Sequence, residues 1–168
     1  MQIRTREFAG DRPACRRGCP GRVHRHGFYW RFAKPSGNHT FRVQRFYCPV
    51  CGLTLSVLPD NRLPYRPLEG ARLEAFFNEE AEAGTGPDPP PDELEAGCLR
   101  RAWLRFQTRA KLLQEAFGLL IAKATDSAAA LWKQMRQAKG SLEGILLFLA
   151  RSDNRSLLGD YQCQRLPV

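Results

Sequence analysis

Four of the six cysteines fall into two close pairs, and this spacing is the strongest chemical signal in the chain. Cys48 and Cys51 have two residues between them and Gly52 after them, whereas Cys15 and Cys19 are separated by three residues. Thiolates at such spacings bind metal through tight turns, and structural zinc sites take four of these ligands in a tetrahedron. The 28 residues between the pairs suit a hairpin that brings them together. We therefore predict one structural zinc ion bound by Cys15, Cys19, Cys48 and Cys51.

Two alternatives stay open for these cysteines. They can be unligated thiols in a small core, or His24 or His26 can replace Cys19 or Cys15 as a ligand. A closed site of four thiolates has no open position for a substrate, so the metal is expected to be structural. The remaining two cysteines, Cys98 and Cys163, are interpreted as buried or incidental thiols rather than catalytic groups.

Cationic and aromatic side chains alternate through the segment between the cysteine pairs. On a strand the two faces separate, so we expect one face to pack while the other offers guanidinium groups to phosphates. A solvated basic face around an aromatic core is the alternative and has the same pattern. The candidate nucleic-acid contacts here are Arg22, Arg25, Arg31, Arg42 and Arg45.

A second basic row lies in the C-terminal half. Arg101, Arg105 and Arg109 are four residues apart, beside Arg100. On a helix this spacing places them in one ridge, as expected for a helix against DNA. An ordinary solvated helix face fits the same spacing.

The charge distribution also favours a polyanionic partner. The net charge is +9 and the sequence pI is about 9.7. Residues 1–66 carry a net charge of +10, residues 67–98 carry −8, and residues 99–168 carry +7. Such an imbalance bears on binding partners and not on the fold.

The elements that must position these residues follow from hydrophobic periodicity. Alternating patterns predict strands over 22–32, 39–45 and 53–57, with a turn at Lys34-Pro35-Ser36-Gly37-Asn38 between the first two. A short acidic amphipathic helix is expected around 73–82, followed by a Pro-rich loop.

A long helix is expected to begin near Asp92, and two shorter helices at 126–138 and 141–150, with a break at Lys139-Gly140. Apolar residues in the long helix recur at steps of four and three, which indicates one buried stripe that is more typical of an intramolecular core than of a dimer seam. The stripe comprises Leu99, Trp103, Phe106, Ala110, Leu113, Phe117, Leu120 and Ala124.

Together these patterns predict an α+β protein, with a small β zinc ribbon followed by a mostly α-helical module. The expected parts are a basic arm (1–14), a zinc ribbon (15–66), an acidic helix with a Pro-rich linker (67–98), and a helical module (99–168) for which a helix-turn-helix is a candidate arrangement. The longest apolar run has six residues, against roughly 20 for a membrane span. With no secretory pattern at the N-terminus, we expect a cytoplasmic protein without a membrane partner.

The run from Cys48 to Pro59, with His26-Gly27-Phe28-Tyr29 and Arg45-Phe46-Tyr47 before it, resembles the N-terminal zinc ribbons of insertion-sequence transposases. In those proteins a helix-turn-helix follows, and the segment from Leu99 to Phe106 looks similar to its end. The first pair departs from the family in having three intervening residues instead of two. After residue 98 only five residues are acidic and the pattern is helical, so the family's nuclease domain is not expected.

The resemblance implies a DNA-binding protein, either a transposon accessory factor or a transposase-derived regulator, without enzymatic activity. The alternative is a protein-interaction module, in which the ribbon is a scaffold and the 99–124 helix binds a transposase or a second copy. A third possibility is RNA binding through exposed aromatic side chains, with a preference for single strands. The sequence contains no phosphate-binding glycine loop and no Gly-x-Ser-x-Gly motif.

Overall fold

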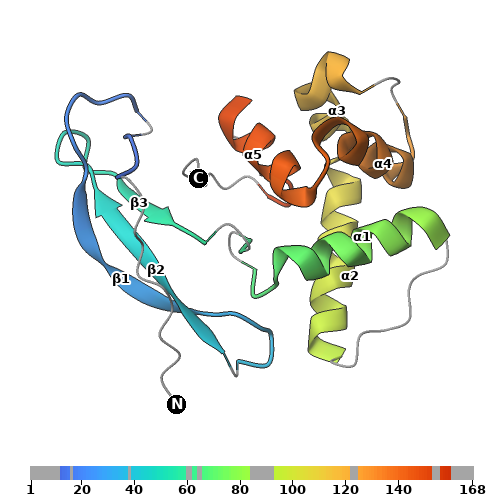
Figure 1. Cartoon of the computed structure of the whole chain (residues 1–168), viewed down its shortest axis with the longest axis horizontal. Coiled ribbons are helices and arrows are strands. Elements are labelled where there is room, and N and C mark those ends of the chain that lie inside the picture. The colour runs from blue at the N-terminus through green and yellow to red at the C-terminus, as the bar shows by residue number, and fades with distance from the viewer. Residues whose placement is uncertain are drawn as a thin grey trace.

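The computed structural model describes residues 12–15, 17–37, 39–59, 62–63, 66–83, 93–121, 125–152 and 156–159. A three-stranded antiparallel sheet comes first and helices follow, which confirms the α+β class (Figure 1). Most of the expected basic arm, the Pro-rich segment at 84–92 and Cys163 lie outside the described residues. Among the described helices, none has the length and apolar character that crossing a membrane requires.

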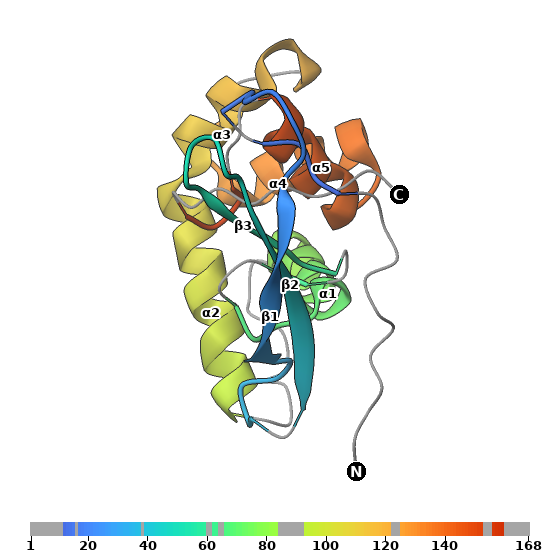
Figure 2. The ribbon, with the colours of Figure 1, turned by 90° about the vertical axis from the view of Figure 1, so that its left-hand side faces the viewer.

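The sheet consists of β1 (His24–Phe32), β2 (Thr40–Tyr47) and β3 (Thr54–Val57), in the order β1-β2-β3. The predicted hairpin is confirmed, and its turn is closed by hydrogen bonds from Gly37 N to the Lys34 carbonyl and from Ala33 N to the His39 carbonyl. Gly37 has a φ of +74°, a conformation that a residue with a side chain rarely adopts. Figure 2 views the molecule from the side on which the sheet lies, with the strands nearly edge-on in front of the helices.

An irregularity in β1 separates the hairpin into two halves. The pairing register shifts between Arg25 and Phe28, where Gly27 has a φ of +83°. Such an extra residue bends a strand and increases its twist. Along β2, Phe46 is buried in one half, whereas Phe41 and Val43 are buried in the other half. Since side chains alternate across a strand, the buried face changes from one side of β2 to the other.

Each half of the hairpin therefore has its own small core. The cluster at the cysteine end comprises Cys15, Val23, Phe46, Cys48, Leu55 and Val57. The cluster toward the hairpin turn comprises Ala33, Phe41, Val43 and Leu58.

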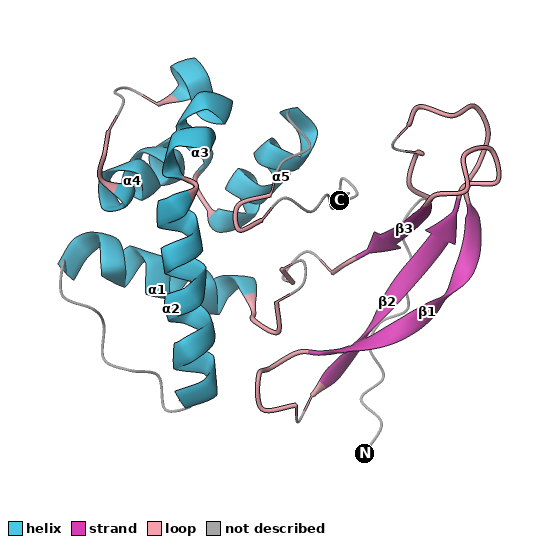
Figure 3. Cartoon of the chain, turned by 180° about the vertical axis from the view of Figure 1, so that it is seen from behind, coloured by secondary structure: helices cyan, strands magenta, loops and turns pink. Residues whose placement is uncertain are grey.

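The helical part contains α1 (Gly70–Ala83), α2 (Glu93–Thr108), α3 (Ala110–Phe117), the 3₁₀ turn η1 (Gly118–Leu120), α4 (Ala128–Lys139) and α5 (Leu142–Ser152). The helices lie apart from the sheet (Figure 3). The Ser127 hydroxyl accepts a hydrogen bond from Ala130 N at the start of α4. Gly140, with a φ of +76°, ends α4, as the predicted break requires.

An aromatic cluster forms the centre of the helical core. Phe77 of α1 lies 4.9 Å from Trp103, 5.3 Å from Phe106 and 5.1 Å from Trp132, measured between ring centroids. The helix expected as part of an acidic connector is thus α1, a member of the same core as α2, α4 and α5. Glu79 and Glu82 lie on its exposed side, and its apolar side packs inward.

The prediction of a single helix over 99–124 is wrong. α2 ends at Thr108, and α3 begins at Ala110 after Arg109, whose N–H bonds the Phe106 carbonyl in a tighter turn. The stripe residues Leu99, Phe106 and Leu113 are fully buried, so the stripe packs inside this chain despite the break. Leu120, the last described member of the stripe, is exposed in η1.

Arg62 connects the hairpin to the start of the helical part. Its Nη1 donates to the Ala33 carbonyl at 3.1 Å, and its Nη2 lies 3.2 Å from Glu69 Oε1. The guanidinium also lies over the Phe41 ring, 5.1 Å from its centroid. One side chain therefore bonds both the hairpin and the residue that precedes α1.

Candidate metal centre and basic surfaces

The second cysteine pair lies in the turn between β2 and β3. Cys48 N donates to the Leu53 carbonyl at 2.9 Å, and Gly52 N donates to the Cys48 carbonyl at 2.9 Å. Gly52 has a φ of +73°, which lets the backbone turn back directly after Cys51. These bonds hold both sulfurs of the pair on one side of the turn.

The first pair precedes β1 and forms a similar turn despite its wider spacing. Gly18 N donates to the Cys15 carbonyl at 2.9 Å, and Gly18 has a φ of +65°. Each pair therefore has a glycine in the left-handed region beside the turn. The third intervening residue does not prevent Cys15 and Cys19 from facing the second pair.

The four sulfur atoms converge, all lying within 4.8 Å of one another. Cys15 Sγ and Cys51 Sγ lie 3.5 Å apart. A tetrahedral ion with metal–sulfur bonds of about 2.3 Å needs sulfurs about 3.8 Å apart. The four cysteines can therefore hold one metal ion, and the site requires only small adjustments to do so.

No histidine of the described segments joins this cluster. The ring of His26 packs beside that of Tyr47, with centroids 5.5 Å apart. The alternative in which His24 or His26 replaces a cysteine thus finds no support in the geometry.

Burial and hydrogen bonding give the four thiols different acidities. A backbone N–H of Arg17 lowers the pKa of Cys15 to about 6, and bonds from the neighbouring thiols act in the same direction against burial. Burial, together with the adjacent thiols, raises the pKa of Cys19 to about 12. At Cys51 a hydrogen bond from the Leu53 backbone acts to lower the pKa, but burial and the bonds to Cys15 and Cys48 raise it overall. A bound cation stabilises all four thiolates and releases the remaining protons.

The arginines of the hairpin belong to a segment of the sequence that contains no carboxylate side chain. Residues 12–59 contain nine Arg and Lys and no Asp or Glu. Arg22 and Arg25 are exposed, whereas Arg31, Arg42 and Arg45 are half-buried. Arg42 lies over the Phe28 ring at 4.8 Å from its centroid. This segment of the sequence therefore carries positive charges only.

The expectation that one face of the first strand packs its aromatic side chains is wrong. Phe28, Trp30 and Phe32 are about half exposed, and almost every side chain of β1 is exposed. The reason is that the two cores of the hairpin contain no side chain of β1 itself: they are built from β2, β3 and residues that flank the strands.

On α2 the predicted ridge is only partly present. Arg100, Arg101 and Arg105 are exposed. Arg109 instead lies at the break after α2, is half-buried, and donates from Nη2 to the Ser156 carbonyl at 3.3 Å. Its position at the helix end turns it out of the row. Cys98 is half-buried, and its sulfur accepts a bond from Arg101 Nη2 at 3.2 Å.

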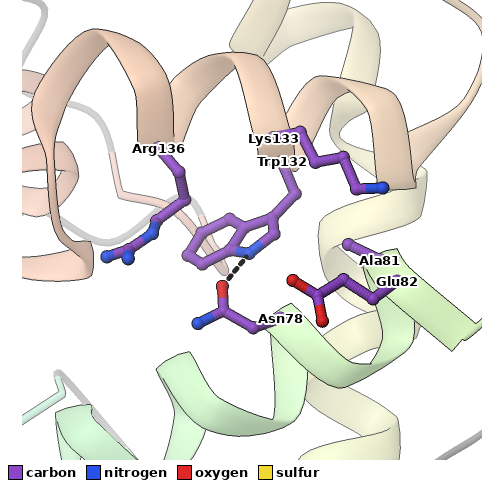
Figure 4. Close-up of a pocket in the computed structure, with 6 residues that line it drawn as sticks. All are labelled: Asn78, Ala81, Glu82, Trp132, Lys133 and Arg136. Carbon is purple, nitrogen blue, oxygen red and sulfur yellow. Dashed lines mark hydrogen bonds between the residues drawn. The ribbon is translucent and has the colours of Figure 1, made fainter.

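A hollow of about 220 Å³ between α1 and α4 was not anticipated from the sequence (Figure 4). At its base Trp132 Nε1 donates to Asn78 Oδ1 at 2.8 Å, and Arg136 at its margin pairs with Glu74. These polar groups bind each other across the two helices. Their evident role is to join α1 and α4, because the indole N–H of a buried Trp needs an acceptor.

Comparison with known proteins adds no relative: no family model matches the chain, and neither a curated protein nor a solved structure is significantly similar to it.

Proposed function

We propose that this chain is a DNA-binding protein in which a structural zinc ion holds a ribbon at the cysteine end of the hairpin. Zinc is the metal for which a four-cysteine set with paired spacing is typical, because it accepts thiolates in a tetrahedron and has no redox chemistry. The core at the cysteine end has only a few apolar residues, so binding of the metal would supply much of the free energy that folds it.

The observation that carries DNA binding is the one-signed charge of the segment that forms the ribbon. Nine cationic residues and no acidic residue occur in 12–59, and a metal-bound hairpin would present them on a fixed scaffold. Guanidinium groups bind phosphate oxygens, and several of them together give affinity that falls steeply with salt. Arg22 and Arg25 are the most accessible of these contacts.

The exposed side of α2 is a second proposed contact, through Arg100, Arg101 and Arg105. The helix-turn-helix considered for residues 99–168 stays a prediction and is not part of this proposal.

The resemblance of the second cysteine pair and its flanking residues to transposase ribbons is the argument for a role beside transposition. On that basis we propose an accessory factor or regulator that binds DNA without cutting it. The alternative of a partner-binding helix loses its main support, because the apolar stripe of α2 and α3 is already buried in the chain's own core.

The test combines metal analysis with a salt series. The purified protein is expected to contain one zinc ion, and its affinity for a labelled DNA, measured by fluorescence anisotropy, is expected to fall steeply with salt. Arg25→Gln should reduce the slope of log affinity against log salt by about one. Lys111→Gln removes the same charge from an exposed position on α3 and should leave the slope unchanged. Absence of DNA binding at low salt, or equal effects of both substitutions, would refute the proposal.

A further inference from the structure

Three aromatic side chains form an exposed row along β1. Phe28, Trp30 and Phe32 lie on one face of the strand and are 50%, 55% and 58% exposed. The other two tryptophans, Trp103 and Trp132, are 8% and 1% exposed in the helical core. A row of three large apolar side chains that are exposed to solvent is typical of a binding surface.

The strand beside this row supplies hydrogen-bonding and cationic groups. In the register of the sheet, Phe28 is opposite Gln44, Trp30 is opposite Arg42, and Phe32 is opposite Thr40. Opposite residues project from the same face, so three rings and three polar side chains share it. The occupant that this face fits offers flat π-surfaces together with negative charge.

Charge opposes a symmetric dimer in which this face pairs with its own copy. Such a dimer would bring together two copies of a segment, 12–59, that contains nine Arg and Lys and no Asp or Glu. Like charges at such an interface oppose association. A nucleic acid supplies both required features, because every base has a π-face and every nucleotide carries a phosphate.

The geometry of the rings favours unpaired bases. Alternate residues on a strand are about 6.7 Å apart, whereas successive bases along one strand of a duplex rise by about 3.4 Å. The planes of Phe28 and Trp30 are also inclined by 87°, with centroids 6.0 Å apart. Two bases that stack on Phe28 and Trp30 must therefore be farther apart than successive bases of a duplex, and their planes must be inclined to each other.

Resting on the DNA-binding function proposed above, we infer that Phe28, Trp30 and Phe32 bind the unpaired bases of single-stranded DNA, while Arg42 and the exposed arginines bind its phosphates. The hairpin then distinguishes opened DNA from duplex DNA through its rings. The arginines supply affinity for either form.

The experiment uses the zinc-loaded full chain and three labelled probes of one sequence: single-stranded DNA, the duplex and single-stranded RNA. The parent is expected to prefer the single DNA strand. Trp30→Ala should weaken that binding by about tenfold and change duplex binding by less than about twofold. Trp30→Tyr keeps a stacking ring and should retain most of the affinity, whereas Trp30→Leu keeps the bulk without the ring and should not.

Controls separate this inference from the underlying function. Circular dichroism and zinc content establish that each variant is folded, and Leu119→Ala removes an exposed apolar side chain of η1 as a matched surface change. Duplex binding without a preference for the single strand overturns the inference but leaves DNA binding intact. Equal binding by the Leu and Tyr variants, or a preference for RNA, overturns it as well. Failure to bind any probe at low salt overturns both proposals.

Discussion

Replacing Arg62 by Met tests whether one side chain joins the hairpin to the helical part. Methionine keeps an apolar stem of similar length, so the substitution removes the charge and its bonds with little loss of packing. The lost contacts are the bond to the Ala33 carbonyl, the contact with the Phe41 ring and the ion pair with Glu69.

The expected destabilisation follows from these three contacts. A hydrogen bond from a charged donor contributes about 1.5 kcal/mol. A partly desolvated cation over an aromatic ring contributes about 1 kcal/mol. The side chain of Glu69 is 46% exposed, so the ion pair adds no more than about 0.5 kcal/mol. We therefore expect Arg62→Met to lower the free energy of unfolding by about 3 kcal/mol, a large part of the stability of an ordinary domain.

Urea unfolding followed by circular dichroism measures this difference on the zinc-loaded protein. Glu69→Gln is the matched control, because it removes the ion pair and leaves both hairpin contacts of Arg62 in place. It is expected to cost about 0.5 kcal/mol or less. An Arg62→Met protein as stable as the parent would contradict the reasoning. An equal loss of stability in Glu69→Gln would contradict it as well, because the stabilisation would then come from the ion pair alone.

Three further outcomes are expected. Cys48→Ser should release zinc and disorder the ribbon while the helical circular dichroism persists, and a variant that retains full metal would disprove the ligand assignment. Zinc affinity, measured by competition with a chromophoric chelator, should fall as pH falls, because protons compete for thiols such as Cys19, whose pKa is about 12. A zinc affinity that does not depend on pH would contradict binding by four thiolates. Phe77→Ala should destabilise the protein by about 3–5 kcal/mol in urea unfolding, since the ring is fully buried among three others, whereas Leu104→Ala, at a 58% exposed position, should cost less than about 0.5 kcal/mol.

Much of the fold was predictable because local signals and tertiary structure agree. Strand alternation and the Pro-Ser-Gly turn gave the hairpin within about two residues, and Gly140 gave the break between α4 and α5. The convergence of the four cysteines was also predictable, since metal-ligand spacing is a local constraint on the backbone.

The features that the sequence did not reveal depend on tertiary context. Alternation shows that Phe28 and Trp30 share a face, but the same alternation fits a buried or an exposed face. Steps of three and four residues continue through Arg109, so periodicity alone gives no sign of the break there. The side chain of Arg109 bonds a carbonyl 47 residues away in sequence, and no local pattern contains that partner.

The change of buried face along β2 has a consequence for how the hairpin unfolds. Phe46 belongs to the core at the cysteine end, while Val43 and Phe41 belong to the core next to Arg62. Two cores of this kind can open independently, each with its own free energy. In hydrogen-exchange measurements, we expect chelation to expose the amides around Phe46 while those around Val43 stay protected. We therefore expect two cooperative folding units in the hairpin, one stabilised by the proposed metal and one by the helical part, and the row of Phe28, Trp30 and Phe32 lies largely on the second.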